Sequence, residues 1–254
     1  MQQRSHRLRR IFASDGRTLI VAMDHAGYMG PVPGLIDPAA TVRKVVAGGA
    51  DAVMAQLGSA RRIVGALDGR GLIISVDLNA PDPVAVVEQA VAFGADGIKT
   101  LAYWGSDDPT GLRNLGRYGV LCERWGMPFQ AEMIPVSFAA VDKHTPANIA
   151  IAARVGAECG ADHVKTMYTG DPETFRAVVE GAGVPVIILG GARSDGGTAI
   201  ARQVADAVSV GAAGIAFGRN IWSAPDPEEA TRAFAAAIHG PTSRAGRVPQ
   251  ATRA

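Results

Sequence analysis

The chain repeats one short phrase four times, as GGADAVM (48–54), GADGIKT (94–100), GADHVKT (160–166) and GAAGIAF (211–217). In each copy, glycine and small residues precede an apolar run with strand-forming residues. A glycine of this kind suits the end of a helix, and such a run suits a strand that is buried on both faces. Each phrase therefore predicts a joint at which a helix ends and a buried strand begins.

Four further apolar runs bring the number of predicted strands to eight: TLIVAMD (18–24), LIISVDL (72–78), PFQAEMI (128–134) and PVIILGG (185–191). Segments with helical periodicity lie between the strands, at 81–93, 145–159, 171–180 and 226–240. Several begin with Asp-Pro or Thr-Pro, which is typical of a helix cap and first turn. This α/β alternation predicts a closed (β/α)8 TIM barrel. An open doubly wound sheet is the alternative fold.

The composition fits one large α/β domain and excludes several classes of partner. The chain has 254 residues, a mass of 26.2 kDa and 48% hydrophobic residues, enough for a sizeable core. Its 25 basic residues balance 24 acidic ones, so no strong field attracts nucleic acid or an anionic membrane. Any phosphate must therefore be bound locally.

The cysteines and the amino-terminal residues indicate a cytoplasmic protein. Cys122 and Cys159 have no spacing typical of a metal site or a disulfide. Residues 1–12 are basic but have no apolar core of signal-peptide length. No uninterrupted run of about 18 apolar residues predicts a membrane span. We therefore expect neither export nor membrane insertion.

The same patterns set the predicted domain boundaries. No linker or shift of composition interrupts residues 14–240. We expect residues 1–240 to form a single (β/α)8 barrel with a short basic amino-terminal helix. Residues 241–254 lack apolar periodicity, so we expect a flexible carboxyl-terminal tail.

Ionisable side chains lie in or just after five of the predicted strands. They are Asp24 and His25 (first strand), Asp77 (third), Lys99 and Tyr103 (fourth), Glu132 (fifth) and Lys165 (sixth). Inward positions alternate along each strand of a TIM barrel, and the active site lies at the carboxyl-terminal mouth. Each residue could instead be a rim charge or half of a structural ion pair. Burial of separate ions costs several kcal/mol each, which favours one shared polar cavity.

Lys165 is the candidate nucleophile of this cavity. A lysine that is partly desolvated and close to another cation loses proton affinity, and a neutral amine can form a Schiff base with a carbonyl. Lys99 would be the neighbouring cation or would bind a substrate oxygen. Asp24 and Glu132 are the candidate proton carriers.

Two glycine-containing segments, LGGARSDGG (189–197) and FGRNIW (217–222), follow the last two predicted strands. TIM barrels often bind phosphate between these loops, where glycine amides and a helix amino terminus act as donors. Glycine also closes tight turns, so a glycine pair alone is weak evidence. The expected phosphate- and substrate-binding residues are Gly190, Gly191, Arg193, Gly218 and Arg219, with His25 supporting Asp24 and Asp77 orienting a lysine ammonium group.

These motifs together resemble the class I (Schiff-base) aldolases of the DeoC/LacD and archaeal-type fructose-bisphosphate aldolase superfamily. The resemblance runs from about Leu19 to about Ala237. MDHAGYMGP (23–31) is similar to the strand-one motif of this group, which implies that Asp24 is a catalytic acid or base. GADHVKT is similar to the strand-six motif, which implies that Lys165 forms the Schiff base. LGG and FGRNIW are similar to the two phosphate loops of the group.

One segment departs from the pattern of the fructose-bisphosphate aldolases. Those enzymes carry Tyr-Pro-Arg-Gly after strand five, with a tyrosine that takes part in proton transfer, whereas EMIPVSF (132–138) places Ile134 there. GIKTLAYW (97–104) is similar instead to the tagatose-bisphosphate and sulfofructose-phosphate branch, which has a strand-four lysine and a strand-five glutamate. This resemblance shifts the expected acid and base work towards Glu132, with Asp24 and Lys99 assisting. Tyr103 is a candidate replacement for the absent tyrosine.

The predicted function is that of a metal-independent class I aldolase acting on a phosphorylated ketose or dihydroxyacetone phosphate. We expect no cofactor, a phosphorylated small-molecule substrate, a homo-oligomer, and no nucleic-acid or membrane partner. Two alternatives stay open: a thiolase- or transaldolase-like transferase that uses the same lysine, and a non-catalytic barrel that binds sugar phosphates. A metal-dependent class II aldolase is disfavoured, because the 5 histidines show no ligand spacing.

Overall fold

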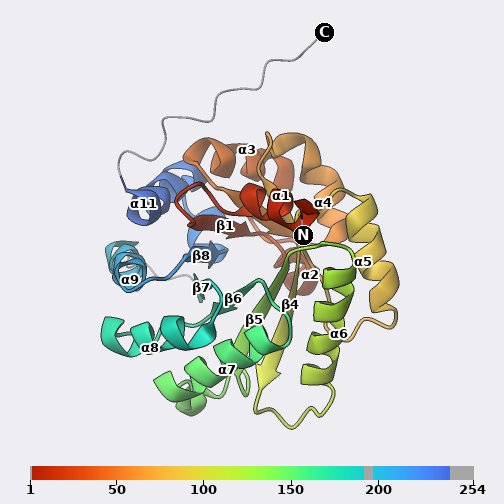
Figure 1. Cartoon of the computed structure of the whole chain (residues 1–254). Helices are drawn as coiled ribbons and strands as arrows, with labels where there is room; N and C mark the ends of the chain where they lie inside the picture. Colours follow the sequence, from red (N-terminus) through yellow and green to blue (C-terminus); the bar gives the residue numbers. More distant parts are fainter. Residues whose placement is uncertain (1, 192–196, 241–254) are drawn as a thin grey trace.

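The computed structural model describes residues 2–191 and 197–240, and within them the strands form a closed parallel barrel in chain order. Figure 1 shows the helices arranged around the outside of the strands. The predicted (β/α)8 TIM barrel is therefore confirmed, and the alternative of an open sheet is wrong. The predicted tail, residues 241–254, lies outside the described residues.

The strands of the barrel are short and begin close to the predicted positions. They are β1 (Thr18–Ala22), β2 (Ala52–Ala55), β3 (Gly71–Ser75), β4 (Gly97–Trp104), β5 (Phe129–Pro135), β6 (His163–Thr166), β7 (Val186–Leu189) and β8 (Gly214–Phe217). Most of their residues are buried, as expected for a parallel sheet covered by helices.

Helices and 3-10 turns (η) connect the strands. They are α1 (Gln2–Ile11), α2 (Ala26–Met29), α3 (Pro38–Gly48), α4 (Leu57–Ile63), η1 (Val64–Ala66), α5 (Pro83–Ala92), α6 (Gly111–Arg124), η2 (Val141–Lys143), α7 (Pro146–Glu158), α8 (Pro172–Ala182), α9 (Gly197–Ser209), α10 (Arg219–Trp222) and α11 (Pro227–His239). No helix in the described part of the chain combines the length and the apolar character needed to cross a membrane.

The Asp-Pro and Thr-Pro pairs start helices as predicted. Asp82, Thr145, Asp171 and Asp226 are the N-caps of α5, α7, α8 and α11, and each accepts a backbone hydrogen bond from the first turn. Proline fits the next position because it lacks the N–H that the helix would leave unpaired there.

The aspartate of the repeated phrase joins neighbouring strands at the amino-terminal end of the barrel. Its carboxylate accepts the amide of the preceding strand in three copies: Asp51 from Leu19 (2.8 Å), Asp96 from Leu72 (2.9 Å) and Asp162 from Phe129 (2.8 Å). The fourth copy has Ala213 at this position. The phrase therefore marks a strand junction as well as the end of a helix.

Helix α1 lies across the same end of the barrel, in front of the strands in Figure 1. Arg10 Nε is 2.8 Å from Asp96 Oδ1, and Arg4 Nη1 is 3.5 Å from Asp162 Oδ1. Ile11 ends the helix fully buried among inward-facing residues of the barrel. The basic helix thus pairs with two of the three aspartates of the repeat, and Asp51 instead lies 2.9 Å from His239 Nε2.

Most of the polar side chains in the barrel interior come from one side. Ile20, Met54, Ile73 and Ile187 form an apolar cluster, whereas β4, β5 and β6 direct polar side chains inward at alternating positions. These polar residues are Lys99, Gln130, Glu132, His163 and Lys165. His163 lies two residues before Lys165 and shares a 3.0 Å hydrogen bond with Gln130; burial lowers the pKa of His163 to about 3.

We predict that Asp96→Ala lowers the free energy of unfolding by about 2 to 3 kcal/mol, because the buried Leu72 amide loses its charged acceptor. Asp107→Ala is the matched control, since Asp107 is exposed and its loss is expected to change stability by less than about 0.5 kcal/mol. Urea unfolding of both variants measures the difference. Equal stability of the two would contradict the junction role of Asp96.

Candidate active site

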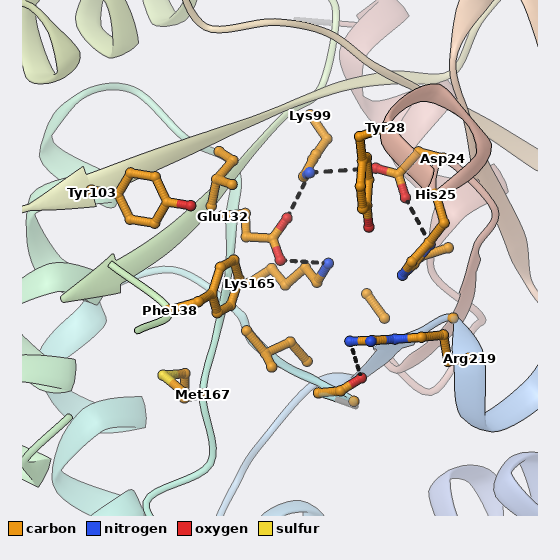
Figure 2. A pocket seen from close by; sticks show the side chains of 17 residues that line it. Asp24, His25, Tyr28, Lys99, Tyr103, Glu132, Phe138, Lys165, Met167 and Arg219 are labelled. Atoms are coloured by element: carbon orange, nitrogen blue, oxygen red, sulfur yellow. Dashed lines mark hydrogen bonds and ion pairs between the residues drawn. The ribbon is translucent and has the colours of Figure 1, made fainter. Parts of the chain in front are cut away.

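A cavity of about 680 Å³ opens at the carboxyl-terminal ends of the strands. Figure 2 shows its side chains gathered from both halves of the barrel. The lining consists of Ala22, Asp24, His25, Tyr28, Lys99, Leu101, Tyr103, Glu132, Phe138, Lys165, Met167, Leu189, Gly190, Gly191, Ala216, Gly218 and Arg219. This is the face where TIM-barrel enzymes carry their active sites.

Four charged side chains form a row of alternating sign at the bottom of the cavity. Lys165 Nζ is 2.7 Å from Glu132 Oε1, and Lys99 Nζ is 2.6 Å from Glu132 Oε2. Lys99 Nζ is also 3.5 Å from Asp24 Oδ2. Each of the four residues is at most 8% exposed. Glu132 therefore lies between the two ammonium groups, as Figure 2 shows.

The pKa values in this row follow from burial and charge. Burial acts to raise the pKa of Glu132, but the ammonium groups of Lys165 and Lys99 outweigh it and hold the pKa below its ordinary value. Burial acts to lower the pKa of Lys99, but Glu132 and Asp24 raise it. Burial acts to raise the pKa of Asp24, but the hydrogen bond from His25 and the charge of Lys99 outweigh it and lower the pKa. Both carboxylates and Lys99 are consequently charged at neutral pH.

The register of three adjacent strands creates this row. Glu132 on β5 pairs with Lys165 on β6, and Lys99 on β4 pairs with Gln130, the previous inward residue of β5. All of these side chains face the interior because they occupy alternate positions. A slip of one residue would turn a whole set outward, so the packing of the barrel also sets the charge row.

Asp24 lies two residues past the end of β1 and is held by its neighbours. Ser75 Oγ donates a 2.7 Å hydrogen bond to Asp24 Oδ2, and His25 Nδ1 is 3.4 Å from Oδ1. The His25 ring packs against Trp222, whose indole N–H donates to Ala22 O (3.0 Å). Within the described residues, no group of three or more histidine, cysteine, aspartate or glutamate side chains could hold a metal ion.

The loops after β7 and β8 meet on one side of the cavity. Arg219 Nη2 donates to Gly191 O (2.9 Å), and Asn220 Nδ2 donates to Gly190 O (2.8 Å). A Cβ on Gly218 would lie 2.7 Å from Ala22 O and would also overlap the His25 ring, so the site requires glycine there. Arg193, the remaining expected phosphate residue, lies outside the described residues.

Tyr103 and Asp77 occupy different surroundings. Tyr103 lines the cavity, and its partner in the neighbouring strand is Ile134, where the resemblance would place a tyrosine. Asp77 is exposed in the loop after β3 and accepts the Asn79 amide (2.9 Å). None of the ion pairs of the described residues joins Asp77 to a lysine, and the expectation that Asp77 orients a lysine ammonium group stays a prediction.

Seven lining residues are absent from the predicted site, and Tyr28, Phe138 and Met167 are the aromatic and sulfur-containing ones among them. Met167 and Tyr28 could have been inferred, because Met167 is two residues after Lys165 and Tyr28 follows Asp24 in the same loop. Burial, with Asp24 adding to it, raises the pKa of Tyr28 to about 12, so its hydroxyl is protonated. Phe138 gave no sequence signal. It reaches the cavity after a turn at Val136 (φ 59°) and packs edge-on against Tyr103.

Comparison with known proteins gives a consistent family. Residues 18–224 match the model of the DeoC/LacD family aldolases. The chain is 36% identical over 242 residues to 2-amino-3,7-dideoxy-D-threo-hept-6-ulosonate synthase of Halobacterium salinarum, covering 92% of this chain and 90% of the relative. It is 32% identical over 260 residues to 2-amino-4,5-dihydroxy-6-oxo-7-(phosphonooxy)heptanoate synthase of Streptomyces griseus, covering 97% and 94%.

Solved structures point the same way. An archaeal fructose 1,6-bisphosphate aldolase superposes with a TM-score of 0.81 at 30% identity, covering 93% of this chain and 99% of the other. A Schiff-base-forming fructose-1,6-bisphosphate aldolase gives 0.80 at 32% identity, covering 92% and 99%. A third structure, of an archaeal fructose-1,6-bisphosphate aldolase whose catalytic lysine is covalently bound to a carbinolamine intermediate, gives 0.82 at 30%, covering 93% and 100%.

We predict that Glu132→Gln lowers the free energy of unfolding by about 3 kcal/mol at pH 7, because two buried ammonium groups lose the charge between them. The pKa of Glu132 is lower in the folded protein than in the unfolded chain. The stabilisation by the Glu132 carboxylate is therefore fully present above the unfolded pKa and is lost as the pH falls through the folded pKa. The difference in the free energy of unfolding between Glu132→Gln and wild type should therefore become smaller below about pH 4.3. Chemical unfolding at several pH values measures it.

The matched control is Glu88→Gln, which removes an exposed carboxylate of α5. Its stability should follow that of wild type at every pH. A Glu132→Gln protein that also matched wild type would show that Glu132 does not hold the two lysines.

Proposed function

The chain belongs to the DeoC/LacD family of aldolases, and from this premise we propose that it is a class I aldolase whose Lys165 forms a Schiff base with a phosphorylated ketone. The observation that carries the proposal is the contact between Lys165 Nζ and Glu132 Oε1, 2.7 Å apart inside the cavity. A lysine nucleophile needs a proton acceptor within hydrogen-bond reach, and Glu132 supplies one.

In the proposed first step, Glu132 takes a proton from the Lys165 ammonium group, and the amine adds to the substrate carbonyl. The resulting carbinolamine loses its hydroxyl group as water, with Glu132 returning the proton. The product is an iminium ion on Lys165. This ion accepts electrons from the neighbouring carbon atoms and so makes cleavage or formation of a C–C bond accessible.

In the cleavage direction, a base removes the proton of the hydroxyl group on the carbon that will leave. The C–C bond then breaks and an aldehyde departs. The electron pair of the broken bond moves towards the iminium and converts it into an enamine. Glu132 is the proposed base, with Asp24 as the second carboxylate. Tyr103 is a candidate donor to the enamine carbon; burial, with Glu132 adding to it, raises the pKa of Tyr103, which keeps its hydroxyl protonated.

Lys99 is proposed to control the charge of Glu132. Its ammonium group is 2.6 Å from Glu132 and 3.5 Å from Asp24, so it remains a partner for both carboxylates while Lys165 is neutral or bound to substrate. Without it, a buried Glu132 would gain proton affinity each time Lys165 lost its charge.

The loops after β7 and β8 are proposed to bind the phosphate group. Glycine backbone at Gly190, Gly191 and Gly218 allows close approach, and Arg219 offers the guanidinium charge. Binding there would fix a dihydroxyacetone phosphate unit with its carbonyl near Lys165.

Two relatives are named as synthases, which supports condensation as well as cleavage. A cytoplasmic homo-oligomer and a single domain over residues 1–240 stay predictions from the sequence.

The Schiff base is tested by borohydride reduction in the presence of dihydroxyacetone phosphate, followed by peptide mass mapping. The chain has lysine only at positions 44, 99, 143 and 165, so the modified site is unambiguous. We predict one adduct, on Lys165, which Lys165→Met abolishes and the exposed control Lys143→Met retains. An adduct on Lys99, or none with any phosphorylated ketone, would contradict the proposal.

The phosphate loop is tested by Arg219→Ala. We predict a KM for dihydroxyacetone phosphate that is roughly 10- to 100-fold higher, the value of a charge-assisted hydrogen bond of about 1.5 to 3 kcal/mol, with a smaller change in kcat. The reaction of unphosphorylated dihydroxyacetone should change little. Arg232→Ala, at an exposed position of α11, is the control and should leave both KM values unchanged. Equal effects of Arg219→Ala on the two ketones would argue against phosphate binding.

A further inference from the structure

A second lobe of about 460 Å³ adjoins the cavity at Lys99. The two lobes share a wall formed by Asp24, Tyr28, Lys99, Leu101 and Tyr103. The rest of the second lobe comes from the ends of β2 and β3 and from the loop between β4 and α6: Gln56, Ser75, Val76, Asp77, Leu78, Asn79, Ser106, Asp108 and Gly111. A substrate held at Lys165 could therefore extend past Lys99 into this lobe.

The second lobe differs in charge from the first. Its described wall carries two carboxylates of its own, Asp77 and Asp108, and no cation other than Lys99. Lys99 is already paired with Glu132 and Asp24. The first lobe, in contrast, has Arg219 beside the glycine loops. One end of the cavity is thus suited to an anion, and the other end is not.

The two carboxylates are held in place by their loops. Asp108 Oδ1 accepts from the Thr110 hydroxyl (2.6 Å) and amide (2.8 Å). The Thr110 hydroxyl, with its amide, lowers the pKa of Asp108, so this side chain is negative at neutral pH. Asp77 Oδ1 accepts the Asn79 amide in the same way. A phosphate that entered the lobe would meet two fixed negative charges.

Neutral hydrogen-bonding groups fill much of the remaining wall. Gln56, Ser75, Asn79 and Ser106 bring amide and hydroxyl groups to the lobe. The Gln56 amide lies against the backbone of Gly27, where a Cβ would overlap it. Such groups match the hydroxyl groups of a sugar chain: the Ser75 and Ser106 hydroxyls, which already donate to Asp24 and to Tyr103 O, can accept, and the side-chain amides of Gln56 and Asn79 can donate.

We propose that the second lobe binds the aldehyde half of the substrate and that this half carries hydroxyl groups but no phosphate. The substrate is then a ketose monophosphate, with its one phosphate at the β7 and β8 loops. This inference rests on the proposed aldolase function and adds the chemical class of the second reactant. An aldehyde that bears a phosphate would place a dianion beside Asp77 and Asp108 without a free cation to balance it.

Unreactive analogues test the inference without requiring turnover. Glucitol and mannitol 1-phosphates and the matching 1,6-bisphosphates differ only by the second phosphate, and calorimetry measures their affinities. We expect the better monophosphate to bind at least tenfold more tightly than its bisphosphate. In condensation with dihydroxyacetone phosphate, kcat/KM should likewise be at least tenfold higher for glyceraldehyde than for glyceraldehyde 3-phosphate.

A double variant tests the role of the two carboxylates. Asp77→Asn with Asp108→Asn keeps an oxygen to accept the loop hydrogen bonds but removes both charges. The preference for the monophosphate should fall at least threefold. Asp107→Asn removes the adjacent exposed charge, which does not line the lobe, and should leave the preference unchanged.

The outcomes separate this inference from the function on which it rests. If dihydroxyacetone phosphate gives no adduct on Lys165, the proposed function fails and the inference fails with it. If the adduct forms but the bisphosphate binds as tightly as the monophosphate, or neither hexitol phosphate binds, only the inference is overturned. An unchanged preference in the double variant would also overturn it.

Discussion

Glu132 joins two buried lysines, and this contact is the constraint on which the rest of the site depends. A carboxylate that touches two ammonium groups at 2.6 and 2.7 Å can stay charged in the barrel interior, and so can its partners. Asp24 completes the balance by facing Lys99. Loss of Glu132 would leave Lys165 without its carboxylate, and loss of Lys99 would leave Asp24 without its lysine, so the two inner members hold the row together.

The two ends of the barrel divide stability and chemistry. At the amino-terminal end, Asp51, Asp96 and Asp162 join neighbouring strands, and arginines of α1 pair with Asp96 and Asp162. At the other end, the same strands present Lys99, Glu132 and Lys165. Residues at the amino-terminal ends of the strands thus stabilise the barrel, whereas residues nearer the carboxyl-terminal ends form the site. The apolar packing inside the barrel keeps the charge row in register, as expected for this fold.

The sequence predicted the architecture well because its signals are local. Proline after an aspartate or threonine N-cap marks the start of a helix. The repeated phrase marks the start of every even-numbered strand. The inward direction of Lys165 followed from the cost of burying separate charges, which favours one shared cavity. The position of Glu132 between the lysines did not follow, because it depends on how β4, β5 and β6 align. Phe138 and the second lobe were missed for a similar reason: loops from several strands build them, and no single segment carries the signal.

The most direct test of the account is a crystal structure of the protein after borohydride reduction with dihydroxyacetone phosphate. The account predicts continuous density from Lys165 Nζ to the substrate carbon, with the phosphate between the β7 and β8 loops and Glu132 still in contact with Lys99. Density on Lys99 instead, or a phosphate seated beside Asp77 and Asp108, would contradict it.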